Sequence, residues 1–89
     1  MSQVVKRPCY RTVSCHSNQE LIVKTGFNQF SLSDFYIYNL GVDVLEIVIN
    51  NSDEPIYISP DEYYTCPSWM EVYSCVTLNA GDCKYGGLF

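Results

Sequence analysis

The chain has 89 residues, enough for one small domain with a thin hydrophobic core. Ten acidic and five basic side chains give a net charge of -5, which argues against a nucleic-acid partner because phosphate binding needs clustered Lys and Arg. No run reaches the ~18 apolar residues of a membrane helix, and the first residues lack the apolar stretch of an export signal, so we expect synthesis in the cytoplasm and no membrane partner.

Period-two alternation of apolar and polar residues recurs along the chain and predicts short β-strands. They cover residues 9–16, 20–24, 29–33, 35–40, 44–50, 55–59 and 69–78. Asn, Asp, Gly and Ser between these runs predict antiparallel hairpins between neighbouring strands. Seven short strands of this kind predict an all-β fold, either a small antiparallel β-sandwich or a barrel.

The chain is predicted to form one domain with a short extension at each end. Residues 1–89 are interpreted as a single β domain, with 1–8 as a basic N-terminal arm and 84–89 as a C-terminal tail. Residues 60–68 begin and nearly end with proline, which cannot donate to a strand ladder, so we expect this segment to leave the sheet.

The segment 47–59, IVINNSDEPIYIS, is the clearest hairpin. Alternation places Ile47 and Ile49 on one face and predicts that they meet Ile56 and Ile58 in the core, across a turn formed by NNSDE. In the run 69–78 the same rule divides the side chains between two faces, with Val72 and Val76 on the inner one. That face is predicted to hold Met70, Val72, Ser74, Val76 and Leu78, and the opposite, semi-polar face Trp69, Glu71, Tyr73, Cys75 and Thr77.

Candidate catalytic groups are few. Cys15 and His16 are neighbours on a predicted strand, so their side chains point to opposite faces and do not form a nucleophile and base pair. The acidic pairs 53–54 and 61–62 lie in turns, where carboxylates are ordinarily solvated. The sequence therefore predicts no catalytic, cofactor-binding or metal-binding residues, and no enzyme.

Five cysteines are many for this length: Cys9, Cys15, Cys66, Cys75 and Cys83. No Cys-x-x-Cys pair occurs and the chain has one histidine, which argues against a structural zinc site. We interpret most of the cysteines as small buried apolar residues in a reduced chain. Disulfides formed late, after release from a cell, are the alternative.

Contact residues are predicted at both ends of the chain and in the aromatic segment after the hairpin. Four of the five basic residues fall within residues 1–24, so a basic front could dock onto an acidic neighbour, although a solvated basic strand explains the same pattern. Apolar residues at the C-terminus suit insertion into a partner. The predicted partner-binding residues are Lys6, Arg7, Arg11, Tyr63, Tyr64, Trp69, Leu88 and Phe89.

The run EIVINNSDEPIYIS resembles a hairpin of small β-sandwich structural proteins of tailed bacteriophages. An apolar strand ends in Asn-x-Ser, and a polar turn leads into a branched-Tyr-branched triplet. The residues that match are Ile49, Asn51, Ser52, Ile56, Tyr57 and Ile58. The resemblance implies a non-enzymatic virion component that clamps or decorates a shell.

The leading hypothesis is thus a capsid decoration or cement protein on the surface of a virion. Such a protein binds and stabilises the shell of the major capsid protein, or another virion protein, as a small homo-oligomer. A phage tail or head-tail connector component is the first alternative. The second is a small acidic binding module that inhibits a host enzyme.

Overall fold

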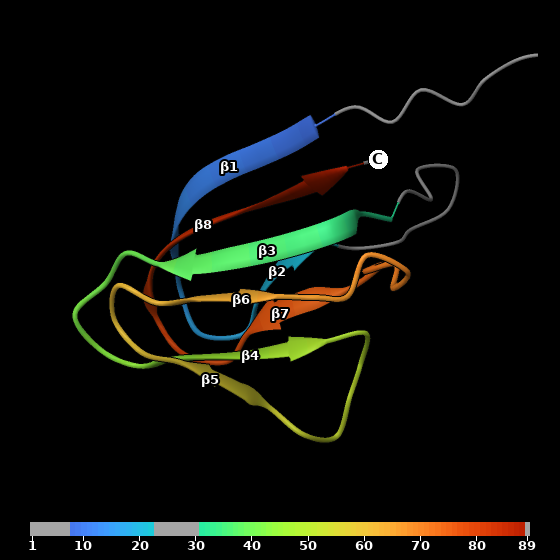
Figure 1. Cartoon of the computed structure of the whole chain (residues 1–89). Coiled ribbons are helices and arrows are strands. Elements are labelled where there is room, and N and C mark those ends of the chain that lie inside the picture. Colours follow the sequence, from blue (N-terminus) through green and yellow to red (C-terminus); the bar gives the residue numbers. More distant parts are fainter. Residues whose placement is uncertain (1–7, 23–30, 89) are drawn as a thin grey trace, which may run out of the picture.

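The computed structural model describes residues 8–22 and 31–88, and in this part of the chain eight β-strands form two sheets (Figure 1). The strands are β1 (Pro8–Cys15), β2 (Gln19–Ile22), β3 (Ser33–Asn39), β4 (Leu45–Ile49), β5 (Ile56–Ile58), β6 (Tyr63–Thr65), β7 (Cys75–Thr77) and β8 (Gly81–Leu88).

The two sheets have four strands each, in the orders β1-β8-β3-β6 (sheet A) and β2-β7-β4-β5 (sheet B), and every pairing is antiparallel. Except between β4 and β5, each connection between successive strands passes from one sheet to the other. Two four-stranded sheets with this strand order form a jelly roll. The predicted all-β sandwich is confirmed, with eight described strands where seven were predicted.

The core lies between the sheets and follows the alternation of the central strands. In β3, Phe35 and Ile37 point inward and are fully buried, and in β4 Leu45, Ile47 and Ile49 are buried. The predicted hairpin of β4 and β5 is confirmed, with Ile47 opposite the half-buried Ile56.

The turn of this hairpin has the conformation that its residues favour. Asn50 and Asn51 both adopt positive φ, at 53° and 57°, and the amide of Ser52 donates to the carbonyl of Ile49 at 3.1 Å. Asn tolerates the left-handed region better than other non-glycine residues, so the sequence explains this turn locally.

The prediction of hairpins between all neighbouring strands is wrong for the described strands other than β4 and β5. Turn residues indicate where the chain reverses, but they do not select the strand with which it then pairs. β1 pairs with β8, and β2 pairs with β7, across most of the chain length.

Two segments predicted to lie outside the sheets are strands. Tyr63–Thr65 forms β6, an edge strand of sheet A. Pro60 and Pro67 lie outside its ladder, so they do not prevent the strand from pairing. Residues 84–88, predicted as a tail, belong to β8 in the middle of sheet A. Gly86 and Gly87, near the end of this strand, are held between the two neighbouring strands β1 and β3.

The long strand predicted over 69–78 is also wrong, since only Cys75–Thr77 pairs as β7 and Val72 forms an isolated bridge with Leu32. The side-chain oxygen of Asn50 accepts from the amides of Tyr73 and Ser74, at 2.9 and 3.3 Å. These bonds interrupt the alternation, so Cys75 and Thr77 are buried and the predicted inner-face residue Val76 is half-buried. Of the strand predicted over 29–33, residues 29 and 30 lie outside the described part.

A β-bulge shifts the register of β3 against β8 between Ser33 and Tyr36. Asp34 lies in the bulge with φ at 51°. The bulge and β8 approach closely at Gly87, where a Cβ would lie 2.7 Å from the Ser33 carbonyl oxygen and 3.0 Å from Cβ of Leu32. Glycine at this position therefore permits the contact that shapes the start of β3.

The other end of β3 is held by a buried side chain, that of Asn39. Its amide nitrogen donates to the carbonyls of Asp43 and Ile58, at 2.8 and 2.9 Å, and its oxygen accepts from the amide of Gly41 at 2.8 Å. The backbone amide of Asn39 also donates to the carbonyl of Glu62 at 2.9 Å. One residue thus joins both sheets and two connecting loops.

We expect Gly87→Ala to lower the free energy of unfolding by about 1–3 kcal/mol, because the added methyl group meets backbone that cannot move aside easily. Gly81→Ala is the matched control, since its Cβ would lie in ordinary contact, 3.6 Å from Cδ1 of Leu45. Urea unfolding of both variants measures the difference. Equal stability of the two variants would contradict the close approach at Gly87.

We expect Asn39→Ala to cost about 2–4 kcal/mol of stability, because it leaves buried backbone groups without partners. Asn51→Gly is the control, as Asn51 is exposed and glycine keeps its positive φ. Thermal and urea unfolding report the change. A variant Asn39→Ala that unfolds like the wild type would show that water replaces these bonds at no cost.

Candidate functional site

The outer face of sheet A is rich in tyrosine because of the alternation in β3. Inward-facing Phe35 and Ile37 are separated by Tyr36 and Tyr38, which point outward and are half-buried. Strand residues alternate between faces, so a strand with apolar residues at one parity and tyrosine at the other presents rings to the solvent side.

The strands β6 and β8 flank β3 and extend this tyrosine-rich surface, because their register places outward-facing side chains beside Tyr36 and Tyr38. Tyr38 lies between Tyr63 of β6 and Lys84 of β8, which are its partners on either side. Tyr36 lies between Thr65 and Gly86 in the same way. These residues come from segments far apart in the sequence and form two adjacent cross-strand rows on one face.

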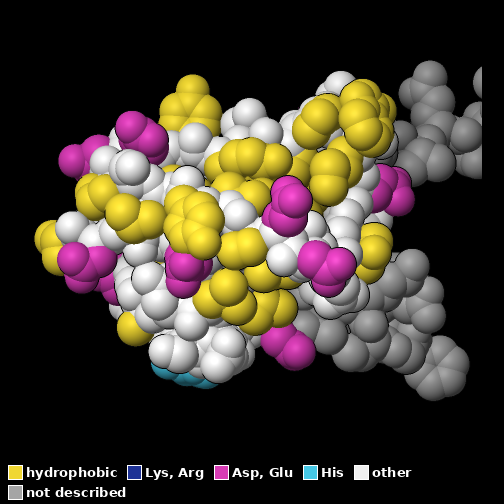
Figure 2. Space-filling model, turned by 90° about the horizontal axis from the view of Figure 1, so that it is seen from below, with side chains coloured by type: hydrophobic (Ala, Val, Ile, Leu, Met, Phe, Trp, Pro, Cys, Tyr) yellow, Lys and Arg dark blue, Asp and Glu magenta, His cyan; other side chains and the backbone are white. Residues whose placement is uncertain are grey.

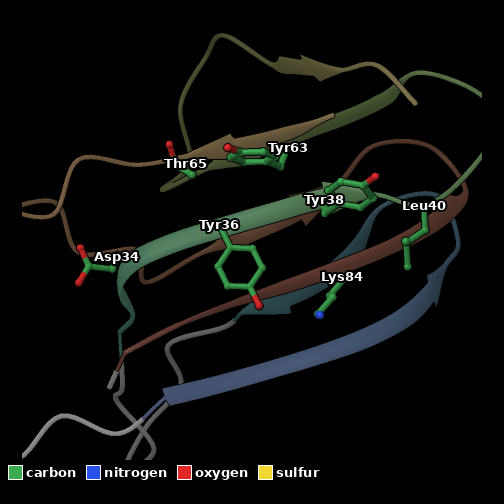
Figure 3. Close-up of a pocket in the computed structure, with 7 residues that line it drawn as sticks. All are labelled: Asp34, Tyr36, Tyr38, Leu40, Tyr63, Thr65 and Lys84. Carbon is green, nitrogen blue, oxygen red and sulfur yellow. The ribbon is translucent and has the colours of Figure 1, made fainter. Parts of the chain in front are cut away.

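Together they line an open groove of about 610 Å³, which we call the tyrosine groove (Figure 3). Its lining residues are Asp34, Tyr36, Tyr38, Leu40, Tyr63, Thr65 and Lys84. This volume falls within the range of small-ligand and peptide sites, and the groove is lined by rings and a few polar groups.

Two rings of the groove stack on each other, and neighbouring side chains contact the rings of this face. Tyr38 and Tyr63 stack with ring centroids 6.5 Å apart and planes 22° from parallel. The hydroxyl of Tyr38 donates to Oδ1 of Asp61 at 3.5 Å. Nζ of Lys84 lies 5.8 Å from the ring centroid of Tyr10, a cation–π contact at the β1 side of the face.

Asp34 is the acidic residue at one end of the groove (Figure 3). It is exposed, and its positive φ places it in a region that non-glycine residues seldom occupy. Bulges next to binding sites redirect a side chain, and a residue held in such a conformation points to a local role. The bulge thus gives the groove a carboxylate at the edge of its aromatic floor.

The described part of the chain is strongly acidic, but the groove itself is lined by one acidic and one basic side chain, Asp34 and Lys84. The described residues include all ten Asp and Glu of the chain but only two basic residues, Arg11 and Lys84. On the side of the molecule shown in Figure 2, acidic side chains are interspersed with hydrophobic ones and no Lys or Arg of the described part is visible. A ligand of this surface is favoured if it carries positive charge.

Of the residues predicted to bind a partner, the structure places Tyr63 in the groove, where its side chain is 66% exposed. Tyr64 faces the opposite way and packs against the core, because neighbours on a strand alternate. Trp69 is 81% exposed in the loop between β6 and β7 and does not line the groove. The predicted aromatic contact segment is therefore divided between three environments.

The other predicted contact residues do not gather at the groove. Arg11 is exposed on β1, outside the lining residues. Leu88 is half-buried in β8, opposite Ser33, and is not a free apolar end. Lys6, Arg7 and Phe89 lie outside the described residues.

Sequence reasoning missed most of the groove. The parity of Tyr36 and Tyr38 in FYIYNL was a usable signal, since it places two tyrosines opposite Phe35 and Ile37. Lys84 could not be found in this way, because its segment was interpreted as a tail. Asp34 depends on a bulge that no local pattern indicates.

The structure separates the Cys15 and His16 side chains, as alternation predicts. Cys15 is buried, whereas His16 is exposed and its Nδ1 lies 2.9 Å from the carbonyl oxygen of Ser17. Asp53 and Glu54 are exposed in the turn of the β4–β5 hairpin.

Four cysteines, Cys15, Cys66, Cys75 and Cys83, are buried as thiols, and the side chain of Cys9 lies outside the described part. Burial raises the pKa of Cys75 to about 12, with smaller contributions from Cys66 and Cys15. Burial also raises the pKa of Cys83, assisted by its contact with Cys15, whose Sγ is 3.4 Å away. Thiols that stay protonated are weak nucleophiles, so Cys75 and Cys83 act as small core side chains.

Residues 8–22 and 31–88 hold neither a metal-ligand cluster nor a membrane-spanning helix. No group of three or more His, Cys, Asp or Glu side chains in these ranges could hold a metal ion. None of the segments in these ranges is a helix with the length and apolarity that crossing a membrane requires.

Comparison with protein-family models, curated proteins and solved structures finds no match to this chain. The chemistry of the tyrosine groove is therefore the basis for inferring function.

We expect the protein to lose stability as the pH rises from about 9 towards 12, through its buried thiols. Burial raises the pKa of Cys75 in the folded state from 9.0 to about 12. The free energy of unfolding is therefore highest below pH 9 and falls above it, because the thiol of the unfolded chain ionises while that of the folded chain stays protonated. Urea unfolding at about pH 8 and about pH 10.5 measures the loss. Cys75→Val removes the ionisable group and should lose less stability over this interval; an equal loss would assign the effect to other groups.

Proposed function

We propose that the protein is a non-enzymatic structural component of a virion, a capsid decoration or cement protein that binds the assembled major-capsid shell through the tyrosine groove. The observation behind this proposal is the open row of tyrosine rings on the outer face of sheet A. Tyrosine is enriched at protein interfaces, because its ring buries a large area while its hydroxyl keeps a polar partner.

The composition of this face supports adhesion. Tyr10 and Tyr63 are each about two-thirds exposed, at 67% and 66%, and Tyr36 and Tyr38 are half-buried between them. Clustered exposed apolar area of this kind marks binding surfaces. Rigid rings on a sheet also lose little conformational entropy on binding.

The topology is compatible with a virion protein but does not select one. Jelly rolls occur in viral capsid proteins, lectins and cupins, so this support is an analogy at the level of the fold. The hairpin that resembles phage structural proteins lies in sheet B and builds the core through Ile47 and Ile49. In this proposal it is scaffold, and sheet A makes the contact.

A tail or head-tail connector position would use the same surface chemistry at a different place in the particle. Copy number separates the two, because decoration proteins cover the shell in many copies and connector parts form a single ring. Quantitative mass spectrometry of purified particles gives this number.

The acidic surface favours a second candidate function, a small binding module that inhibits a host enzyme. The described residues hold ten acidic and two basic side chains, a charge distribution that suits an enzyme with a basic binding site. Capture of one soluble host enzyme, together with no affinity for capsids, would support this function over the first.

Purified protein is expected to co-sediment with capsids that lack it and to raise their temperature of disruption. Tyr63→Ala should weaken this binding by at least about tenfold, because it removes an exposed ring from the groove, while stability changes by less than about 1 kcal/mol.

Tyr57→Ala is the matched control for this test. Tyr57 is 62% exposed, like Tyr63, but lies on β5 in sheet B. Equal weakening by the two substitutions would remove the groove from the proposal. No affinity of the wild type for such capsids would refute the proposed function itself.

A further inference from the structure

We propose that the tyrosine groove recognises an extended, proline-containing segment of its partner protein, with a Lys or Arg of that segment placed beside Asp34. The inference rests on the proposed function in assigning this groove to protein binding, and it adds the chemistry of the segment that the groove takes.

The floor of the groove suits proline because it is built from flat rings. Tyr38 and Tyr63 stand nearly parallel, 22° apart in plane, and Tyr36 lies in the neighbouring cross-strand row of the same face. Leu40 is the only aliphatic side chain among the described residues that line the groove. Aromatic-lined grooves bind polyproline II segments, whose pyrrolidine rings pack against aromatic faces.

The hydroxyl groups of the groove match the backbone of such a segment. A polyproline II helix makes no internal hydrogen bonds, so its carbonyl oxygens need donors from outside. The hydroxyls of Tyr36, Tyr63 and Thr65 lie along the groove as donors, whereas the hydroxyl of Tyr38 donates to Asp61. Because the segment is already extended in solution, it loses little entropy when it binds.

The carboxylate of Asp34 favours a basic residue where the segment passes this end of the groove. Asp34 is exposed at the bulge, and the described surface holds ten acidic side chains against two basic ones. Lys84 also lines the groove, beside Tyr38, and its Nζ lies over the Tyr10 ring on the β1 side. An Arg at the end of the segment can pair with the carboxylate of Asp34 and stack on a tyrosine ring.

The test uses the full chain and synthetic hexaproline peptides with Arg at the N-terminus or at the C-terminus. A hexaproline with Glu in place of Arg tests charge, and a Gly/Ser peptide with the same Arg tests proline. Titration followed by tyrosine fluorescence and by NMR is expected to show saturable binding of at least one Arg-hexaproline, at least about tenfold tighter than the Glu peptide.

Two variants locate the binding. Tyr63→Ala should weaken it about tenfold, with Tyr57→Ala as the unaffected control. Asp34→Asn keeps a residue that tolerates positive φ, so the fold is retained, and it should weaken only the Arg peptides, by about fivefold at low salt and less at high salt.

Several results would overturn the inference: no binding of either Arg-hexaproline at millimolar concentration, equal binding of the Gly/Ser peptide, or binding unchanged by Tyr63→Ala. If the peptides fail while Tyr63→Ala still weakens binding to capsids, the proposed function stands and the inference falls. If the peptides bind and capsids do not, the inference stands and the proposed function falls.

Discussion

The buried amide of Asn39 is the interaction on which the arrangement of the two sheets depends. Asn39 ends β3 in sheet A, and its side chain bonds to the carbonyl of Ile58 in sheet B and to two groups of the loop that leads to β4. A thin sandwich has few contacts between its layers. A buried polar side chain whose hydrogen bonds are all formed fixes the relative position of the two sheets more specifically than apolar packing alone. The reason is that each hydrogen bond requires a particular distance and direction.

The same residue positions the tyrosine groove. The backbone of Asn39 donates to the carbonyl of Glu62 and accepts from the amide of Asp61, so the loop before β6 is held against the end of β3. This contact places β6 in register with β3, and with it the ring of Tyr63 beside the ring of Tyr38. The shape of the groove therefore depends on the backbone hydrogen bonds of the residue whose side chain joins the two sheets.

At the opposite end of β3 the constraint is steric. Gly87 lets β8 approach the bulge closely, and the bulge holds Asp34 at a positive φ at the end of the groove. The floor between these two ends is rigid, because β3 is paired on both sides. A rigid aromatic surface with one fixed carboxylate can select a ligand by shape and charge without any moving part.

The sequence by itself determined the local features. Alternation predicted the strands around Phe35 and Ile47 and the buried face of Ile47, and the Asn50 turn follows from the tolerance of Asn for positive φ. Only the tertiary structure decided the pairing. Lys84 enters the groove because β8 inserts between β1 and β3, whose residues lie some 45 to 75 positions earlier. Such pairing depends on how two complete sheets pack, and no short stretch of sequence encodes the partner of a strand.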